Sequence, residues 1–333
     1  MRIAFLGNFG PSFSTESHLA VSFESLGHEV VRLQEGEVRA LDVPDRASGC
    51  DLFVWVQTYG LAVSGGTLDE RRWMIDELRS RGIFSLSLHL DRWWGLDRQD
   101  QIDTEPFFRT DLVATADGGH AEQWKQAGIN HMWFPPGICH TEAHPGTFRQ
   151  RWQSDIAFVG FFRPGYHAEW THRPHLIQHL KRRWRNKVKF FPTNPRQPVR
   201  GADLRDLYAS VKVCVGDSCL VPKVTGEPQT LYHSDRIPET LGRGGFLLHP
   251  HVEGVTDGLY VDGQHLGCWP LGDWDSLDSL IAYYLEHSDL RERIAQQGRA
   301  HVLEHHTYRV RLQRVLEHIS VLHLGEALES TDG

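Results

Sequence analysis

The feature that most constrains the fold is the alternation of short apolar runs with stretches of helical length. In the first half of the chain the apolar runs occupy residues 2–7, 28–33, 51–56, 83–90 and 111–116, and helical patterns occupy 13–26, 68–81 and 119–127. Glycines follow the first two of these helical stretches, at Gly27 and Gly82, as is common where a helix ends. This alternation predicts right-handed crossovers and a mostly parallel sheet covered by helices.

A second α/β series follows a Pro- and Gly-bearing segment. Apolar runs recur at residues 155–161, 187–191, 211–217 and 245–250, helical patterns occupy 172–185, 204–210 and 234–243, and the chain is helical almost to its end after Asp275. A length of 333 residues suits two domains of about 150 residues. We therefore predict an N-terminal Rossmann-like domain over residues 1–140, a linker over 141–153, a C-terminal Rossmann-like domain with C-terminal helices over 154–325 and a tail over 326–333. Paired doubly wound sheets of this kind bind ligands in a cleft lined by the carboxyl ends of their strands.

Composition excludes several classes of protein. We see no signal peptide and no run of 18 apolar residues, so we expect a cytoplasmic protein without a membrane span. The five cysteines include no C-x-x-C pair, which favours reduced thiols over disulfides or structural zinc. A net charge of −8 argues against non-specific affinity for polyanions, although residues 163–200 contain ten Lys and Arg and one acid.

The most informative segment is Tyr232–Pro250, which contains a predicted helix followed by a buried strand. Ser234 or Asp235 suits the N-cap position, and the helix N-terminus would direct free amides toward a diphosphate. Arg236 supplies a planar cation that matches phosphate oxygens. Glu239, one turn later, can accept hydrogen bonds from a ribose diol. The alternative for Arg236 and Glu239 is an ordinary i, i+3 surface pair.

The pattern S-x-R-x-x-E-x-x-x-x-G-G-F in this segment resembles the donor-site helix of bacterial and phage glycosyltransferases related to the spore-maturation protein CgeB. The stretches FVGFFRPGY and ERIAQQGRAHVLEHHTYRVRLQRVL are similar to further parts of that family, so the resemblance covers about residues 155–316. It implies a GT-B fold and transfer of a sugar from a nucleotide diphosphate donor, with no tightly bound cofactor and with Mg²⁺ dependence left open. The wider retaining pattern has a glutamate where this chain has Leu231, which leaves the anomeric outcome open.

Three further residues are candidates for donor binding. Gly160 and Arg163 follow the strand DIAFVG and suit a phosphate or sugar contact, with plain turn chemistry as the alternative. Lys223 lies in a long loop, where a solvated lysine is the ordinary expectation.

On the acceptor side, Asp91 follows the strand IFSLSLHL. A carboxylate at that position can deprotonate an acceptor hydroxyl, whereas the alternatives are an N-cap or an ion pair with Arg92. His18, on the first helix, is the second catalytic candidate, although a lone helical histidine is more often structural.

The histidines do not indicate a metal site. His172, His175 and His179 share a helical face, but no carboxylate or cysteine accompanies them at convincing spacing. The basic segment HLKRRWRNKVKFF invites a nucleic-acid interpretation. In this topology its helix runs away from the cleft, so a solvated helix end is expected. Because some phage relatives glycosylate hydroxymethylated bases, the resemblance also implies DNA as one possible acceptor, beside a glycan or a small molecule.

The sequence therefore predicts a glycosyltransferase that acts on a hydroxyl acceptor bound by the N-terminal domain. Two alternatives stay open. A nucleotide-sugar epimerase would release a changed sugar from the donor alone, and a non-catalytic sugar-nucleotide- or DNA-binding protein would bind without turnover.

Overall fold

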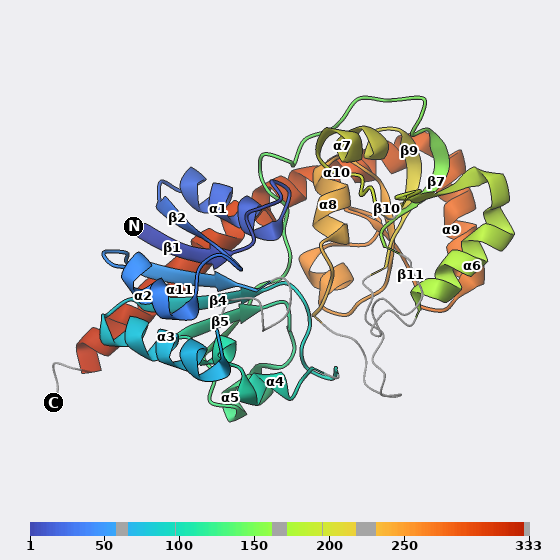
Figure 1. The fold of residues 1–333 in the computed structure, drawn as a ribbon. Helices are drawn as coiled ribbons and strands as arrows, with labels where there is room; N and C mark the ends of the chain where they lie inside the picture. The colour runs from blue at the N-terminus through green and yellow to red at the C-terminus, as the bar shows by residue number, and fades with distance from the viewer. Residues whose placement is uncertain (58–65, 97, 162–171, 195, 218–230, 330–333) are drawn as a thin grey trace. The chain divides into compact units, whose positions relative to one another are not determined.

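The computed structural model describes residues 1–57, 66–96, 98–161, 172–194, 196–217 and 231–329. The chain divides into two compact units (Figure 1). Unit 1 comprises Met1–Pro135 and Tyr308–Gly333, and unit 2 comprises Pro136–Thr307.

Unit 1 is built on a six-stranded parallel sheet with the strand order β2-β1-β3-β4-β5-β6. Its strands are β1 (Arg2–Gly7), β2 (Glu29–Gln34), β3 (Leu52–Val56), β4 (Phe84–His89), β5 (Leu112–Thr115) and β6 (His131–Trp133). The helices of this unit are α1 (Thr15–Ser25), α2 (Val43–Arg46), α3 (Leu68–Ser80), α4 (Gln101–Thr104), α5 (Ala121–Gln126) and α11 (Tyr308–Glu329), with short 3₁₀ turns at Ala40–Asp42 and Pro106–Arg109.

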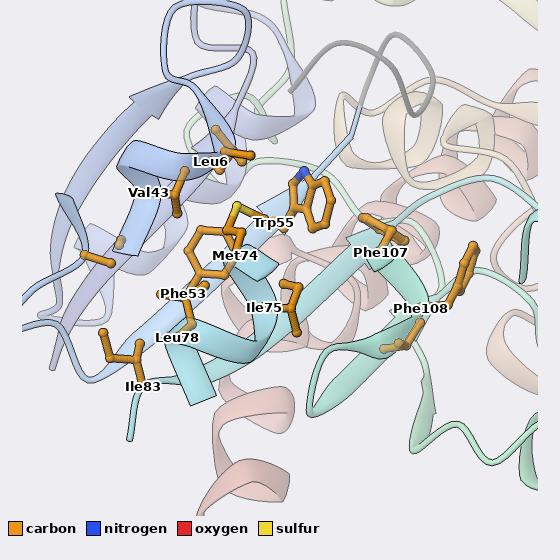
Figure 2. Packing of buried hydrophobic residues seen from close by; sticks show 14 of the residues in the cluster. Leu6, Val43, Phe53, Trp55, Met74, Ile75, Leu78, Ile83, Phe107 and Phe108 are labelled. Atoms are coloured by element: carbon orange, nitrogen blue, oxygen red, sulfur yellow. The ribbon is translucent and has the colours of Figure 1, made fainter. Parts of the chain in front are cut away.

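Local sequence explains why α3 forms at this point and how it packs. Thr67 and Glu70 form a reciprocal capping box at its start, and Gly82, with φ of 70°, follows its end. Met74, Ile75 and Leu78 line the buried face. Figure 2 shows these side chains packed with residues of the sheet in one apolar cluster.

Unit 2 contains a five-stranded parallel sheet with the order β11-β10-β9-β7-β8. The strands are β7 (Ser154–Val159), β8 (Val188–Phe191), β9 (Val211–Val215), β10 (Leu247–Pro250) and β11 (Gly267–Trp269). The helices are α6 (Arg173–Trp184), α7 (Gly201–Tyr208), α8 (Arg236–Gly242), α9 (Trp274–Glu286) and α10 (Ser288–His305), with a 3₁₀ turn at Arg185–Lys187 and a π-helical turn at Val255–Leu259. One apolar cluster covers each face of this sheet, with α7 and α8 contributing to one and α6 and α9 to the other.

The terminal helix differs from the sequence-based domain boundaries. We expected all C-terminal helices to belong to the domain over 154–325, and a tail from 326, but residues 308–333 group with unit 1 and α11 continues to Glu329. The reason is that α11 carries an apolar stripe of Leu312, Val315 and Ile319. These side chains are buried, and the helix packs against α1.

The segment 141–153, expected to be a linker, is part of unit 2. Two backbone N–H groups fasten it to the end of α7: Thr147 N donates to Asp206 Oδ1 at 2.8 Å, and Arg149 N donates to Ser210 Oγ at 2.8 Å. At Gly146 an added Cβ would lie only 2.2 Å from the Arg205 backbone carbon, so this close approach requires glycine.

Candidate active site

The carboxyl edge of the unit 2 sheet has a topological switch point between β7 and β9. Successive strands run outward in opposite directions from this point, because β8 lies beside β7, whereas β10 and β11 lie beyond β9. Open α/β sheets bind ligands where the strand order reverses in this way. The chain leaves the two central strands at Gly160 and Gly216.

The side chain of Arg236 lies across both of these glycines. A Cβ added to Gly160 would be 2.8 Å from Arg236 Nη2, and one added to Gly216 would be 2.9 Å from Arg236 Cγ. The absence of side chains at the two strand ends therefore leaves the space that the guanidinium and its alkyl stem occupy. Gly160 and Arg236, both predicted donor-site residues, are in direct contact.

A buried ion pair fixes the same edge and escaped the sequence analysis. Arg173 and Asp217 are 3% and 4% exposed. Arg173 donates to the Asp217 carboxylate from Nε at 3.1 Å and from Nη2 at 2.6 Å, and its Nη1 donates to the Phe161 carbonyl at 2.7 Å. The pair thus ties the start of α6 to the residues that follow β7 and β9. The sequence did contain a signal for this pair, because Asp217 is a charged residue that comes just after a buried strand.

Glu239 belongs to a charge network rather than to a pair with Arg236. Its Oε2 accepts from Arg243 Nη1 in the next helical turn, and Arg243 Nη2 lies 3.3 Å from Glu142 Oε2. Glu142 also accepts from Arg205 Nη1 at 2.8 Å. Burial raises the pKa of the Glu239 carboxyl, while Arg243 opposes that rise. The network fixes the orientation of this carboxylate, which lies one helical turn after Arg236.

One of the two predicted N-cap positions, Asp235, is confirmed. Helix α8 begins at Arg236, and its N-cap is Asp235, whose side chain makes no capping hydrogen bond. Ser234 Oγ accepts from Arg236 N at 3.4 Å, a long contact. Because α8 has only seven residues, Arg236 is the stronger source of positive charge here. Arg163 and Lys223 lie outside the described residues.

Leu231 occupies the position where the wider retaining pattern has a glutamate. Its backbone is left-handed, with φ of 48°. Its Cδ2 would lie 2.3 Å from a Cβ added to Gly254, so the leucine packs directly on that glycine. The position is therefore apolar in this chain.

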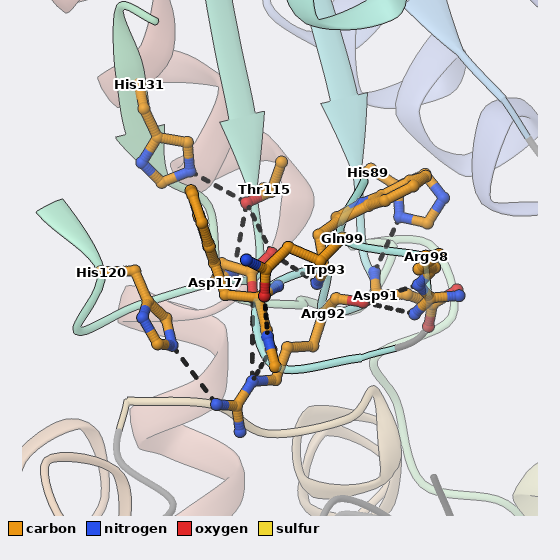
Figure 3. A network of polar contacts seen from close by, with 12 residues as sticks. His89, Asp91, Arg92, Trp93, Arg98, Gln99, Thr115, Asp117, His120 and His131 are labelled. Carbon is orange, nitrogen blue, oxygen red and sulfur yellow. Dashed lines mark hydrogen bonds and ion pairs between the residues drawn. The ribbon is translucent and has the colours of Figure 1, made fainter. Parts of the chain in front are cut away.

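The carboxyl edge of the unit 1 sheet holds Asp91. Its side chain is exposed, and its backbone N–H donates to His89 Nδ1 at 3.0 Å, directly after β4 (Figure 3). His89 therefore accepts through Nδ1, and burial lowers its pKa to about 4, so the ring is neutral at pH 7. Asp91 is not paired with Arg92: the Nε of Arg92 donates to the Trp94 carbonyl at 2.9 Å.

Asp117 anchors the segment that follows Asp91. Its Oδ2 accepts from Trp93 N at 2.8 Å, and Arg92 Nε lies 3.9 Å from Oδ1. Burial raises the pKa of Asp117 to about 7, while the Trp93 N–H and Arg92 oppose that rise. Figure 3 shows this carboxylate between the Arg92 segment and Thr115 of β5. The anchor places Asp91 on a fixed support rather than on an isolated loop.

His18 is the fourth residue of α1, at the end of its first turn, and is half-buried. It follows β1, whereas Asp91 follows β4, and β3 separates these two strands. Neighbouring strands are about 4.8 Å apart, so the ends of β1 and β4 lie roughly 10 Å apart. Topology therefore does not bring the two catalytic candidates together.

His172 and His179, on the helical face noted in the sequence, both have structural partners. His179 Nε2 lies 3.1 Å from Asp278 Oδ1, and its ring stacks on Trp274 at 5.0 Å. His306 Nε2 lies 3.0 Å from His301 Nε2. Among the residues that the structure describes, no three His, Cys, Asp or Glu side chains converge in an arrangement that could hold a metal ion. None of the helices in the described part of the chain combines the length and apolar character needed to cross a bilayer.

Comparisons place this architecture among known proteins. Residues 152–317 match the family model described as glycosyl transferase-like. The chain is similar in structure to the Anabaena protein HepE in complex with UDP and glucose, with 15% identity, a TM-score of 0.59 and coverage of 96% of this chain and 100% of HepE. It is also similar to sucrose-phosphate synthase from Thermosynechococcus elongatus, with 12% identity, a TM-score of 0.59 and coverage of 97% and 100%. A putative UDP-N-acetylglucosamine 2-epimerase from Listeria monocytogenes shares 10% identity, with a TM-score of 0.53 and coverage of 98% and 97%. No curated protein sequence matches significantly.

Proposed function

We propose that this chain, a glycosyltransferase with the GT-B fold, transfers a glycosyl group from a UDP-sugar to a hydroxyl acceptor, with unit 2 binding the donor. The observation that carries the donor assignment is the Arg236 side chain lying across Gly160 and Gly216 at the switch point. A bare strand end beside a fixed guanidinium suits a diphosphate, whose oxygens accept from backbone N–H groups and from the cation. The complex of HepE with UDP and glucose supports uridine as the base to test first.

Glu239 is assigned to the ribose. Its Oε2 is held by Arg243, and among the described residues Oε1 has no hydrogen-bond partner. Oε1 is therefore the oxygen that accepts from a ribose hydroxyl. The buried pairing with Arg243 and Glu142 holds the carboxylate in place without using both of its oxygens.

In the reaction, the bond between the anomeric carbon and the β-phosphate oxygen breaks, and the acceptor oxygen bonds to that carbon. Arg236 stabilises the negative charge that develops on the departing UDP. In an inverting reaction Asp91 takes the acceptor proton. In a retaining reaction the leaving phosphate takes that proton, and Asp91 orients the acceptor. The anomeric configuration of the product, read by NMR, distinguishes the two.

Binding and turnover of UDP-glucose test the proposal. We expect calorimetry to give saturable binding of UDP, with or without added Mg²⁺, and Arg236→Ala to weaken it. Binding without turnover in the presence of hydroxyl acceptors would indicate a binding protein. Conversion of UDP-sugar alone into a different UDP-sugar would indicate an epimerase.

The finer assignment to the CgeB-like glycosyltransferases rests on the motif that contains Ser234, Arg236 and Glu239. This resemblance also implies DNA as an acceptor. The charge of unit 1, the proposed acceptor unit, does not favour DNA, because this unit contains 15 Lys and Arg against 24 Asp and Glu. The basic residues 181–189 belong to unit 2 and begin in the last turn of α6, at the opposite end of that helix from Arg173 and the switch point. A neutral hydroxyl acceptor is therefore our first choice.

A further inference from the structure

The end of α6 and the start of β8 carry a concentration of positive charge that the proposed donor site does not use. Residues 181–189 contain six Lys and Arg and no Asp or Glu, in a chain whose net charge is −8. Four of these side chains are exposed and form no ion pair with another described residue. We call these four the basic patch, and they are Arg182, Arg185, Lys187 and Lys189.

Neighbouring elements of unit 2 do not neutralise the basic patch. Asp155, on β7 beside β8, lies 2.7 Å from Lys212 Nζ, and Asp278, on α9, lies 3.3 Å from Arg183 Nε. Helices α6 and α9 cover the same face of the sheet (Figure 1). The dipole of α6 favours cations in its last turn, but the 3₁₀ turn and β8 lie beyond that turn. The patch therefore holds like charges together without a partner inside the unit.

The surroundings of the basic patch favour a polyanion over a protein partner. The buried centre of a protein–protein interface is apolar and rich in aromatic side chains. Among the described residues of 172–217, no large apolar side chain is exposed. The same observation leaves the patch without an aromatic platform of the kind on which single-stranded nucleic acids stack.

The position of the patch at a helix C-terminus favours a bilayer over a nucleic-acid duplex. Proteins that bind duplexes hold phosphates by direct contacts, to which backbone N–H groups and helix N-termini contribute. The end of α6 presents carbonyl groups instead, and these repel a phosphate at contact distance. A charged bilayer attracts Lys and Arg without direct contact, because its surface potential extends over a Debye length of about 8 Å.

We propose that the basic patch attaches this protein to the surface of an anionic phospholipid bilayer. Clusters of about four to eight Lys and Arg bind such surfaces. The attachment is peripheral and sensitive to salt, because no exposed apolar side chain accompanies the charges. The patch lies at the opposite end of α6 from Arg173 and the switch point, so attachment leaves the donor-binding edge of unit 2 uncovered.

Sedimentation with phospholipid vesicles tests the proposal. At low salt we expect the wild type to sediment with vesicles of equal parts phosphatidylcholine and phosphatidylglycerol, but not with phosphatidylcholine alone. Each Lys or Arg near such a surface changes the partition coefficient about fivefold, so Arg182→Gln/Lys187→Gln should bind roughly 25-fold more weakly. Raising NaCl to about 0.5 M, where the Debye length falls to about 4 Å, should release the wild type.

A second double variant, Arg46→Gln/Lys125→Gln, is the matched control, because it removes two exposed and unpaired cations from unit 1. We expect it to bind the anionic vesicles like the wild type. Failure of the wild type to sediment with these vesicles, or equal losses in the two double variants, would overturn the proposal. Binding of duplex DNA without binding of vesicles would also overturn it and assign the patch to nucleic acid. UDP affinity should be unchanged in Arg182→Gln/Lys187→Gln, and a loss would place the patch in the donor site instead.

Discussion

The contact between Gly160 and Arg236 permits a sharp prediction about donor binding. In Gly160→Ala the added Cβ would lie 2.8 Å from Arg236 Nη2, whereas ordinary contacts begin at 3.4 Å, so the guanidinium must retreat by about 0.6 Å. The closest atom is the far end of a flexible side chain, and Phe158 Cε1, at 3.2 Å, must give by only about 0.2 Å, so the protein is expected to fold. A retreat of this size breaks a hydrogen bond to a phosphate oxygen, because such bonds weaken steeply with distance.

A hydrogen bond that involves a charged group contributes about 1.5–3 kcal/mol. At 1.4 kcal/mol for each factor of ten, the Kd for UDP should rise roughly ten- to 150-fold. Calorimetry of the wild type, Gly160→Ala, Arg236→Ala and the double variant measures this. Gly258→Ala is the matched control in unit 2, since nothing lies within 4 Å of its added Cβ.

The double variant is the decisive sample. Because Gly160→Ala acts through Arg236, it should add little to the loss already caused by Arg236→Ala. Losses that simply sum, or a Gly160→Ala protein that binds UDP as tightly as the wild type, would refute the assignment of this contact to the donor site.

Three other outcomes are expected. Asp91→Asn should lower kcat at least tenfold without changing the free energy of unfolding in urea, because the Asp91 side chain is exposed. Asp117→Ala should lower that free energy by about 2–3 kcal/mol, because it leaves the buried Trp93 N–H without its acceptor. Equal losses of stability in the two variants would contradict this division of roles. Glu239→Ala should reduce the preference for UDP over 2′-deoxy-UDP, and calorimetry that shows an unchanged preference would exclude the ribose contact. Burial lowers the pKa of His249 from 6.5 to about 4, so the contribution of this residue to stability is complete above pH 6.5 and is lost as the pH falls toward 4, at about 1.4 kcal/mol per pH unit. The free energy of unfolding of His249→Asn in urea should therefore depend less steeply on pH than that of the wild type. An identical slope in the two proteins would contradict this prediction.

Sequence periodicity was sufficient for most of the fold. The predicted alternation and the two parallel sheets are confirmed, and so is the GT-B architecture that the family resemblance implied. Strands β6 and β11 were missed because each has only three residues, too few for a recognisable period. The unit to which α11 belongs could not be predicted either, since an apolar stripe shows that a helix is buried but not which surface buries it.

The candidate site was predictable in its residue types but not in its contacts. Gly160 and Arg236 came from separate motifs, and only the fold shows that the arginine lies over the glycine. The Arg173–Asp217 pair joins residues 44 positions apart, so no local pattern reveals it. Glu239 has an arginine at helical spacing on each side, Arg236 three residues before it and Arg243 four residues after it. The ion pair forms with the buried Arg243. The roles of these residues stay predictions.

The route of the chain also has a consequence for synthesis on the ribosome. Unit 2 is continuous in sequence, and Ile138 near its start pairs with Thr307 at its end. Unit 1 is split, because α11, which packs on α1, follows unit 2 in the sequence. Domains generally fold as units while the chain emerges. Unit 2 can therefore complete its core while unit 1 still lacks a helix, so the first unit to be started is the last to be finished.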